Sequence, residues 1–486
     1  MVSVTRVEKS AVDLASTLLA NHGHKLAQHE SLRRWTVRQI KEKLLARMDK
    51  SHRVNGTLPG IIEDRKAVAI AIIHSIERGL AECDMSPAVL HAMIKILAQG
   101  LFLEQGDQPT AERFRQEHGV RPPTFLVLSP GKACNLRCVG CYADSANNQD
   151  LLEWSTVDRI ISEGKTLWGA RFFVISGGEP MAYRSEGKGI LDLIGKHDDC
   201  MFMMYTNGTL IDEKVAQHLA QAGNMLPAIS LEGFRERTDA RRGKGVFDRI
   251  MAAMGHLRAA GIPFGTSLTA TRENAAEILS DEFMDMLEDR GVLFSWIFQY
   301  MPIGRSFTLD LLPTTEQRKW MWQRSWDIVR DRKFFLADFW NSATACGGCL
   351  SAGGHGSGGY FYIDWNGAVS PCVFVPYAPV NIKDVYAKGG NLNDVWADPF
   401  FRSLRQWQFD YIEKQRNQLA PCPNRDHHAE FQQLLAQHEP DPIDENAAQA
   451  LMDAEYGRGL AAYGESYDAL TQDIWQRQYV GSKAQP

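Results

Sequence analysis

Three cysteines at spacing C-x3-C-x2-C constrain this chain more than any other feature. Cys134, Cys138 and Cys141 follow a short apolar run, residues 125–128, so the sequence predicts one cysteine-bearing loop after a buried strand. Three thiolates on one loop suit a [4Fe–4S] cluster with one iron left open, whereas a structural zinc site takes four protein ligands. Half of a zinc site and unligated reduced thiols are the alternatives that the spacing itself leaves.

Composition and charge indicate a globular chain of two or three domains. The chain has 486 residues, of which 44% are hydrophobic and 23% charged, and its formal net charge of −6 gives no overall basic field for nucleic acid. Nine unevenly spaced cysteines with no secretory signal before them predict a reducing, cytoplasmic setting rather than a disulfide scaffold. The longest apolar run, residues 67–73, is too short for a transmembrane segment.

The pattern between about residues 124 and 305 alternates strands and helices, which predicts an α/β fold. Near-continuous apolar strands are typical of a parallel sheet covered by helices. Alternation alone fits a partial barrel or a doubly wound sheet, and both gather cofactor residues at the carboxyl ends of their strands. The predicted strands are 124–128, 171–175, 201–205, 227–231, 263–269 and 293–300, and the clearest predicted helices are 155–167 and 246–259.

The flanking regions are predicted to be helical. Thr314 and Gln317 form a capping-box pattern that opens a helix, whose Trp320 and Trp326 we expect in the core. The tail after about residue 430 is polar, and we expect a peripheral helix or partly ordered arm that ends with Trp475 and Tyr479. Two apolar stripes before residue 120 are interpreted as core packing. These stripes are Ile40, Leu44 and Met48, and then Leu90, Met93, Ile94, Leu97 and Leu101.

Glycine-rich and polar segments follow three of the predicted strands. The second strand ends in Gly-Gly-Glu-Pro, where two glycines let a backbone approach a ligand and Glu179 can accept hydrogen bonds from an ammonium group. Asn207 and Ser230 end the third and fourth strands, where short polar side chains are turn formers by default. An arginine such as Arg242 can bind both oxygens of a carboxylate with its planar fork.

A second cysteine group begins at Cys346 and Cys349, which form a C-x2-C knuckle. The dipeptide Asn366-Gly367 is a strong hairpin signal, so Cys372 is expected to return close to the knuckle. Cys422 lies about 50 residues further along the chain. Four cysteines can close one [4Fe–4S] cluster, and glycine amides near the cluster can bond to its sulfurs. A structural zinc site is the alternative for these four.

The cysteine loop and the Gly-Gly-Glu-Pro segment, about 36 residues apart, resemble the radical SAM (radical AdoMet) superfamily. The resemblance extends over roughly residues 124–425 and implies a partial (β/α)6 TIM-like barrel. It also implies that Cys134, Cys138 and Cys141 hold a [4Fe–4S] cluster whose open iron binds S-adenosylmethionine. Reductive cleavage of that cofactor would give a 5′-deoxyadenosyl radical, which abstracts hydrogen from a substrate.

The same resemblance implies which residues orient S-adenosylmethionine. The Gly-Gly-Glu-Pro segment would meet its amino group, Ser230 together with Arg242 or Arg241 its carboxylate, Asn207 its ribose, and the backbone at Met301 its adenine. The positions implied to bind the cofactor are Gly177, Gly178, Glu179, Asn207, Ser230, Arg242 and Met301.

The region from Cys346 onward resembles the SPASM or twitch extensions of that superfamily, chiefly in Gly367-x4-Cys372 and in residues 392–396, Leu-Asn-Asp-Val-Trp. It departs from the seven-cysteine SPASM pattern, because only Cys422 follows Cys372. One auxiliary [4Fe–4S] cluster is therefore expected, with Cys346, Cys349, Cys372 and Cys422 as ligands. The expected domains are a helical extension (1–120), a radical SAM core (121–310), an auxiliary cluster domain (311–430) and a polar tail (431–486).

The substrate class stays open among a peptide, a lipid and a small metabolite. A radical SAM enzyme also needs an electron donor, and flavodoxin or ferredoxin is the expected partner. The alternative is an iron–sulfur electron carrier or cluster scaffold without turnover. The Gly-Gly-Glu-Pro motif counts against that alternative, because a carrier has no use for a cofactor-binding turn.

Overall fold

The computed structural model of the chain describes residues 30–55, 57–82, 85–86, 88–89, 108–354 and 358–481. The second predicted apolar stripe, from Leu90 to Leu101, lies outside these residues, as does Cys83. The first stripe is confirmed as core packing, because Leu44 is buried with Ala69 and Ile73. The N-terminal helices are α2 (Glu30–Asn55), α3 (Pro59–Glu82) and α5 (Gln108–His118).

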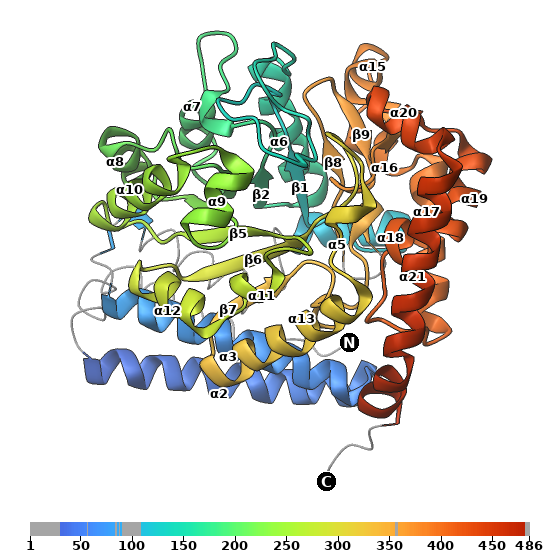
Figure 1. Cartoon of the computed structure of the whole chain (residues 1–486). Helices are drawn as coiled ribbons and strands as arrows, with labels where there is room; N and C mark the ends of the chain where they lie inside the picture. The colour runs from blue at the N-terminus through green and yellow to red at the C-terminus, as the bar shows by residue number, and fades with distance from the viewer. Residues whose placement is uncertain are drawn as a thin grey trace.

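A ten-stranded sheet organises the molecule, in the order β11-β9-β8-β1-β2-β3-β4-β5-β6-β7 (Figure 1). Strands β1 to β6 pair in parallel and in chain order. A doubly wound sheet reverses its direction of growth at a switch point. The unbroken order therefore confirms the partial (β/α)6 barrel. These strands are β1 (Phe125–Leu128), β2 (Phe172–Ile175), β3 (Met201–Thr206), β4 (Met225–Leu231), β5 (Gly265–Ala270) and β6 (Phe294–Gln299).

Amphipathic helices cover the parallel strands, as the alternating pattern predicted. In α6 (Trp154–Trp168), Val157, Ile160, Ile161 and Gly164 are buried at helical spacing. Gly164 has a packing role, because a Cβ there would lie 3.1 Å from the ring of Phe173 on β2. The other helices of the barrel are α7 (Ile190–Lys196), α8 (Glu213–Ala222), α9 (Arg235–Arg242), α10 (Val246–Ala259), α11 (Ala275–Ile278) and α12 (Asp281–Asp289).

The connector after β6 contains a strand that the sequence pattern missed. The predicted capping box at Thr314 opens α13 (Thr315–Asp327), and β7 (Phe335–Asp338) then pairs in parallel with β6. Trp326 is buried as predicted, but Trp320 is 40% exposed, so its assignment to the core was wrong. The reason is helical phase, since Trp322 and Trp326 are four residues apart and share the buried face of α13, whereas Trp320 does not.

The cysteine-rich region after β7 continues the same sheet. The Asn366-Gly367 hairpin is confirmed, since β8 (Tyr362–Ile363) and β9 (Ala368–Ser370) pair antiparallel across it and Gly367 has a φ of 87°. Strand β8 also pairs in parallel with β1, and β11 (Val380–Asn381) pairs with β9. The helices of this region are α14 (Ala343–Cys346), α15 (Ile382–Ala387), α16 (Leu392–Trp396) and α17 (Pro399–Glu413).

The C-terminal tail is helical, as expected, and it packs closely on the rest of the molecule through the buried residues of its longest helix. Its longest helix runs along α13 and the segment after Cys422 (Figure 1). Trp475 is fully buried, and its Nε1 donates to the carbonyl of Gln415 at 3.0 Å. Tyr479 reaches α3, where its hydroxyl donates to Asp64 at 2.8 Å. The tail helices are α18 (Pro423–Asp426), α19 (His428–His438), α20 (Glu445–Met452) and α21 (Ala454–Trp475).

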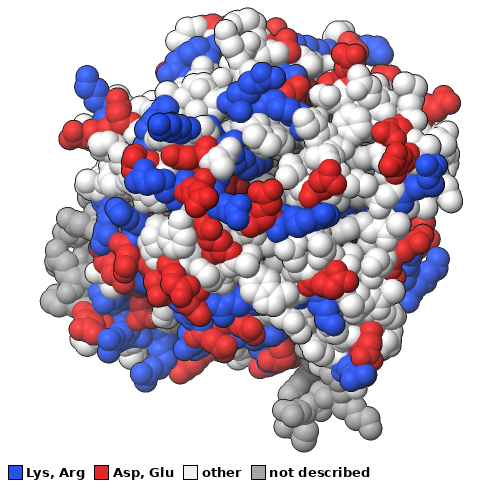
Figure 2. All heavy atoms as spheres, viewed as in Figure 1, with Lys and Arg blue, Asp and Glu red and all other residues white. Residues whose placement is uncertain are grey.

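Acidic and basic side chains are interspersed over the face shown in Figure 2, which agrees with the small net charge of the chain. Within the described residues, no helix combines the length and the apolar character that crossing a membrane requires.

We predict that Trp475→Ala lowers the free energy of unfolding by about 3–5 kcal/mol, because it leaves a large cavity between α21 and the core. Urea denaturation followed by circular dichroism measures this change. Trp320→Ala is the matched control, since that side chain is 40% exposed and its loss is expected to cost about 0.5 kcal/mol. Equal effects of the two substitutions would contradict the packing described for α21.

Candidate active site at the cysteine loop

Backbone hydrogen bonds hold the cysteine loop against the segment that follows β2. The amide of Gly178 donates to the carbonyl of Gly131 at 2.9 Å, and the amide of Glu179 donates to that of Ala133 at 2.8 Å. A Cβ at Gly178 would lie 2.2 Å from the carbonyl oxygen of Ala133, so a larger residue would push the two segments apart. The glycines of the predicted motif therefore position the cysteine loop, and their contact with a ligand stays a prediction.

The carboxylate of Glu179 is buried and already accepts three hydrogen bonds. Its donors are the Thr206 hydroxyl at 2.6 Å, the Asn207 amide at 2.8 Å and the Met181 amide at 3.1 Å. Burial raises the pKa of Glu179, and these donors and Arg242 oppose that shift. Because a carboxylate has about four acceptor sites, one site is left for an ammonium group. Glu179 thus ties the end of β2 to the end of β3.

Hydrogen-bond donors and a guanidinium face the sulfurs of the cysteine loop. The Leu136 amide donates to Cys134 Sγ at 3.4 Å, and Asn207 Nδ2 lies 3.8 Å from the same sulfur. Nη1 of Arg242 lies 4.0 Å from Cys138 Sγ. Burial raises the pKa of the Cys134 thiol to about 11. Bound iron would displace that proton, and the surrounding donors suit the thiolates of an anionic cluster. The loop therefore fits the cluster that the spacing predicts.

Sequence reasoning missed Glu232, which organises both arginines of the predicted pair. Arg241 Nη1 donates to Glu232 Oε1 at 2.7 Å, and Nε of Arg242 donates to the same oxygen at 2.9 Å. The other oxygen, Oε2, is buried without a hydrogen-bond partner in the described structure. Arg242 faces Cys138, whereas Arg241 donates to the carbonyl of Gly140 at 3.3 Å. Arg242 is therefore the better placed of the two for a ligand at the cluster.

Arg305 is a second residue that the pattern did not reveal. Its Nη1 donates to the carbonyl of Cys138 at 2.7 Å, and its backbone amide donates to the carbonyl of Cys141 at 3.0 Å. Arg305 thus clamps the cysteine loop from the segment after β6. No spacing rule marks such a residue, because it lies more than 160 positions from the carbonyl that it binds.

The remaining predicted cofactor residues lie at strand ends of the same barrel. Ser230 is half-buried on β4, and within the described residues its hydroxyl makes no hydrogen bond. Asn207 follows β3, where its side chain also donates to Asn135 at 2.9 Å on the cysteine loop. Met301 follows β6 with its side chain in the core, so only its backbone is available to a ligand. The structure thus places Asn207 against the cysteine loop and puts Ser230 and Met301 at strand ends of the same barrel, and their contact with a cofactor stays a prediction.

Three of the four cysteines in the second group come together. The Ala352 amide donates to the carbonyl of Pro371 at 2.9 Å, which brings the segment after Cys349 against Cys372. Asn424, two residues after Cys422, donates to the carbonyl of Phe374 at 2.8 Å. Burial raises the pKa of the Cys372 thiol, and the thiolates of Cys349 and Cys422 raise it further. A cluster that takes three thiolates from separate loops fits this arrangement.

The fourth predicted ligand of this group is Cys346, and its role as a ligand stays a prediction. It is the last residue of α14, and it is exposed and lies near Arg65 of α3. Arg65 Nε also donates to the carbonyl of Ala345 at 3.1 Å. The packing of α14 on α3 therefore brings the first cysteine of the knuckle close to Arg65. Across the described ranges, no three cysteine, histidine or acidic side chains are close enough to hold a single metal ion.

An aromatic contact joins the two cysteine groups across the barrel. Tyr142 directly follows Cys141, and its ring lies 6.1 Å from that of Phe374 in an edge-to-face arrangement. The Phe374 amide in turn donates to Cys372 Sγ at 3.4 Å. The two cysteine groups are thus connected through neighbouring aromatic residues.

Comparison with known proteins agrees with this geometry. The radical SAM superfamily matches residues 128–281, and the SPASM iron–sulfur cluster-binding domain matches residues 355–424. The mycofactocin maturase MftC of Mycolicibacterium smegmatis is 32% identical over 314 residues, which are 62% of this chain and 77% of that protein. The chain belongs to the radical SAM superfamily. It is an enzyme of that class, whose cofactors are S-adenosylmethionine and [4Fe–4S] clusters, one of them auxiliary.

Another relative matches a smaller part of this chain. The Fe-coproporphyrin III synthase of Methanosarcina barkeri is 32% identical over 187 residues, 37% of this chain, and the chain spans 45% of that protein's length. Among solved structures, SuiB of Streptococcus suis bound to precursor peptide SuiA has a TM-score of 0.49 at 18% identity, covering 64% of this chain and 72% of SuiB.

We predict that Glu179→Gln lowers the free energy of unfolding by about 1–3 kcal/mol, because the new amide nitrogen faces a hydrogen-bond donor in the buried site. S-adenosylmethionine binding to the cluster-loaded protein should weaken as well. Urea denaturation and titration calorimetry measure the two effects. The control is Glu236→Gln, since Glu236 is exposed on α9. If Glu179→Gln keeps full stability and only binds S-adenosylmethionine more weakly, Glu179 serves only to bind the ligand. That result would contradict its role in connecting the ends of β2 and β3.

Proposed function

We propose that this chain cleaves S-adenosylmethionine reductively at a [4Fe–4S] cluster held by Cys134, Cys138 and Cys141. The 5′-deoxyadenosyl radical formed there would take hydrogen from an unreactive carbon of a substrate. The observation that carries this proposal is the position of the three-thiol loop at the carboxyl end of β1, with the half-buried Arg242 facing Cys138 at 4.0 Å. Membership of the radical SAM superfamily supports it.

The residues around the loop receive the following roles in this proposal. Arg242 and Ser230 bind the carboxylate of S-adenosylmethionine, because the Nη1 of Arg242 is directed toward the cluster loop while its other nitrogens hold Glu232. Glu179 accepts a bond from the amino group with its remaining acceptor site, alongside the backbone at Gly177 and Gly178. Asn207 and the backbone at Met301 meet the nucleoside.

We assign the auxiliary cluster to Cys349, Cys372 and Cys422. These thiols are drawn together by contacts between their loops, and the matched SPASM region contains two of them. Cys346 would have to turn away from Arg65 to supply a fourth ligand. In this proposal, the auxiliary domain comprises about residues 311–430 and holds the second cluster. The radical SAM core comprises about residues 121–310.

The substrate class in this proposal is a peptide, a lipid or a small metabolite, with flavodoxin or ferredoxin as the electron donor in the cytoplasm. The relatives are named as a mycofactocin maturase and an Fe-coproporphyrin III synthase, so relatedness by itself selects no substrate class. Profiling of peptides and metabolites in a deletion strain would identify the substrate without a prior guess. Binding of S-adenosylmethionine without cleavage, measured by calorimetry, would favour the alternative of a non-catalytic iron–sulfur carrier.

We predict that replacing Cys134, Cys138 and Cys141 by alanine abolishes 5′-deoxyadenosine formation while the auxiliary cluster stays. Anaerobic reconstitution with a chemical reductant, followed by chromatography, measures the product. The triple variant should lose about half of its iron, because each cluster is a four-iron cube. Loss of all iron would point to one shared site. A fully loaded wild-type protein that forms no 5′-deoxyadenosine would refute the proposed function.

The three-cysteine assignment predicts opposite results for two single substitutions in the second group. Cys422→Ala should remove or alter the auxiliary Mössbauer signal and spare the first cluster, because Cys422 lies beside Cys372. Cys346→Ala should leave both signals intact, because Cys346 faces Arg65. If Cys346→Ala removes the auxiliary signal instead, the knuckle rearranges on cluster binding and the cluster has four cysteine ligands.

A further inference from the structure

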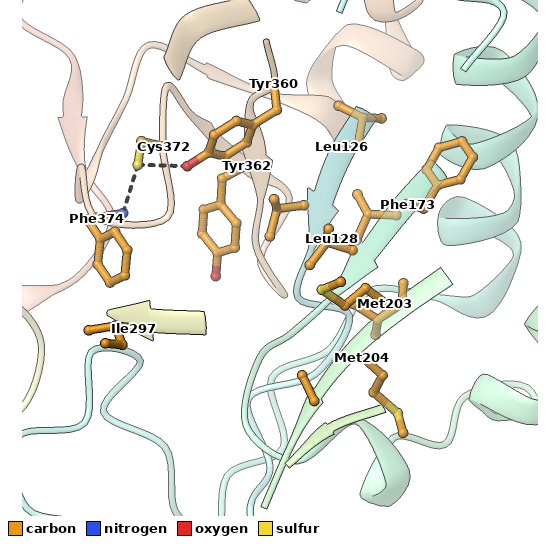
Figure 3. Packing of buried hydrophobic residues seen from close by; sticks show 14 of the residues in the cluster. Leu126, Leu128, Phe173, Met203, Met204, Ile297, Tyr360, Tyr362, Cys372 and Phe374 are labelled. Carbon is orange, nitrogen blue, oxygen red and sulfur yellow. Dashed lines mark hydrogen bonds between the residues drawn. The ribbon is translucent and has the colours of Figure 1, made fainter. Parts of the chain in front are cut away.

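A buried hydroxyl group touches one of the auxiliary cysteines. The phenolic oxygen of Tyr360 lies 3.0 Å from Cys372 Sγ, and both residues are buried (Figure 3). Tyr360 directly precedes the hairpin, and its backbone amide donates to the carbonyl of Leu350 at 2.9 Å. The backbone of Tyr360 is therefore held by the segment that carries Cys349, and its ring stacks on Phe125 of β1.

The direction of this hydrogen bond follows from the chemistry of the two groups. A cysteine that binds iron is a thiolate without a proton, so it can only accept. A phenol carries its proton at neutral pH, so Tyr360 is the donor in this hydrogen bond. The Phe374 amide gives the same sulfur a second donor at 3.4 Å.

A second hydroxyl has the same relation to another of these cysteines. Ser351 Oγ lies 3.2 Å from Cys349 Sγ. The same oxygen accepts a hydrogen bond from Gln408 Nε2 at 2.8 Å, so the serine proton is left for the sulfur. At the first loop the side-chain donors are more distant, since Asn207 Nδ2 lies 3.8 Å from Cys134 Sγ and Arg242 Nη1 lies 4.0 Å from Cys138 Sγ.

We propose that Tyr360, together with Ser351, sets the reduction potential of the auxiliary cluster by donating hydrogen bonds to its cysteine sulfurs. This inference rests on the proposed function, because it requires a cluster at Cys349, Cys372 and Cys422. Donated hydrogen bonds withdraw electron density from cluster ligands and favour the reduced, more negative state. The two hydroxyls thus make the auxiliary cluster a better electron acceptor than the same cluster would be without them. They are positioning residues with an electronic effect and need not touch the substrate.

The test is a redox titration of the reconstituted full-length protein, followed by electron paramagnetic resonance of the auxiliary cluster. Tyr360→Phe keeps the ring and removes the donor, so the potential should become more negative. We expect a change of about tenfold in the reduction equilibrium, which equals about 59 mV for one electron. Ser351→Ala should shift the potential in the same direction, and the double variant should shift it further.

Tyr362→Phe is the matched control, because Tyr362 is equally buried on β8 and its hydroxyl points away from Cys372 (Figure 3). The auxiliary potential should stay unchanged in that variant. An unchanged potential in both Tyr360→Phe and Ser351→Ala, with the auxiliary cluster present, would overturn this inference and leave the proposed function intact. A wild-type protein that holds only the first cluster would overturn this inference and the assignment of the auxiliary cluster, but not the cleavage of S-adenosylmethionine at the first cluster. A shift in Tyr362→Phe as large as in Tyr360→Phe would assign the effect to general repacking and also overturn it.

Discussion

The second cysteine group depends on a buried ion pair between Arg318 on α13 and Asp426 on α18. Both side chains are fully buried, and Asp426 accepts hydrogen bonds from Arg318 at 2.6 and 3.1 Å. Burial raises the pKa of Asp426, but Arg318 and Arg425 outweigh it and hold that pKa well below its usual range. Asp426 also accepts a hydrogen bond from the backbone amide of Cys422 at 3.1 Å. Breaking such a pair would leave an uncompensated buried charge, so the Cys422 loop has little freedom to move.

This pair belongs to a polar network that reaches the barrel. Arg425 donates to Gln299 at 3.0 Å, and Gln299 at the end of β6 donates to both oxygens of Asp338 on β7. The ring of Tyr467 on α21 stacks on Arg318 at 3.5 Å. The position of Cys422 is therefore set jointly by two barrel strands, α13 and the C-terminal helix. A buried polar network is destabilising when some of its groups lack hydrogen-bond partners. This gives a physical reason for the close packing of the tail against the network.

The sequence predicted the barrel well because its signals were local. Each apolar strand from β1 to β6, the Asn366-Gly367 hairpin and the capping box at Thr314 follow from short patterns of residues. The cysteine loop was located for the same reason. The strand β7 was missed because a four-residue strand inside a helical connector has too few residues to establish a period.

The parts that escaped prediction depend on contacts between distant positions. Glu232 and Arg305 act on the cysteine loop from other strands, and nothing in their own neighbourhood of the sequence marks them. Cys346 lies near Arg65 because α3 packs on α14, which the C-x2-C spacing does not reveal. The burial of α21 was missed because its buried residues are diluted by glycines and polar residues.

The pairing of β8 with β1 has a consequence for how this chain can be divided. Through that pairing the auxiliary region covers the edge of the barrel, where Val127 and Leu128 lie opposite Tyr362 and Ile363. A fragment that ended before the second cysteine group would present β1 as a bare apolar edge, open to pairing with another copy. The two metal-binding regions are therefore halves of one folding unit and not interchangeable modules. Evolution could exchange the auxiliary region only for another segment that closes the same edge.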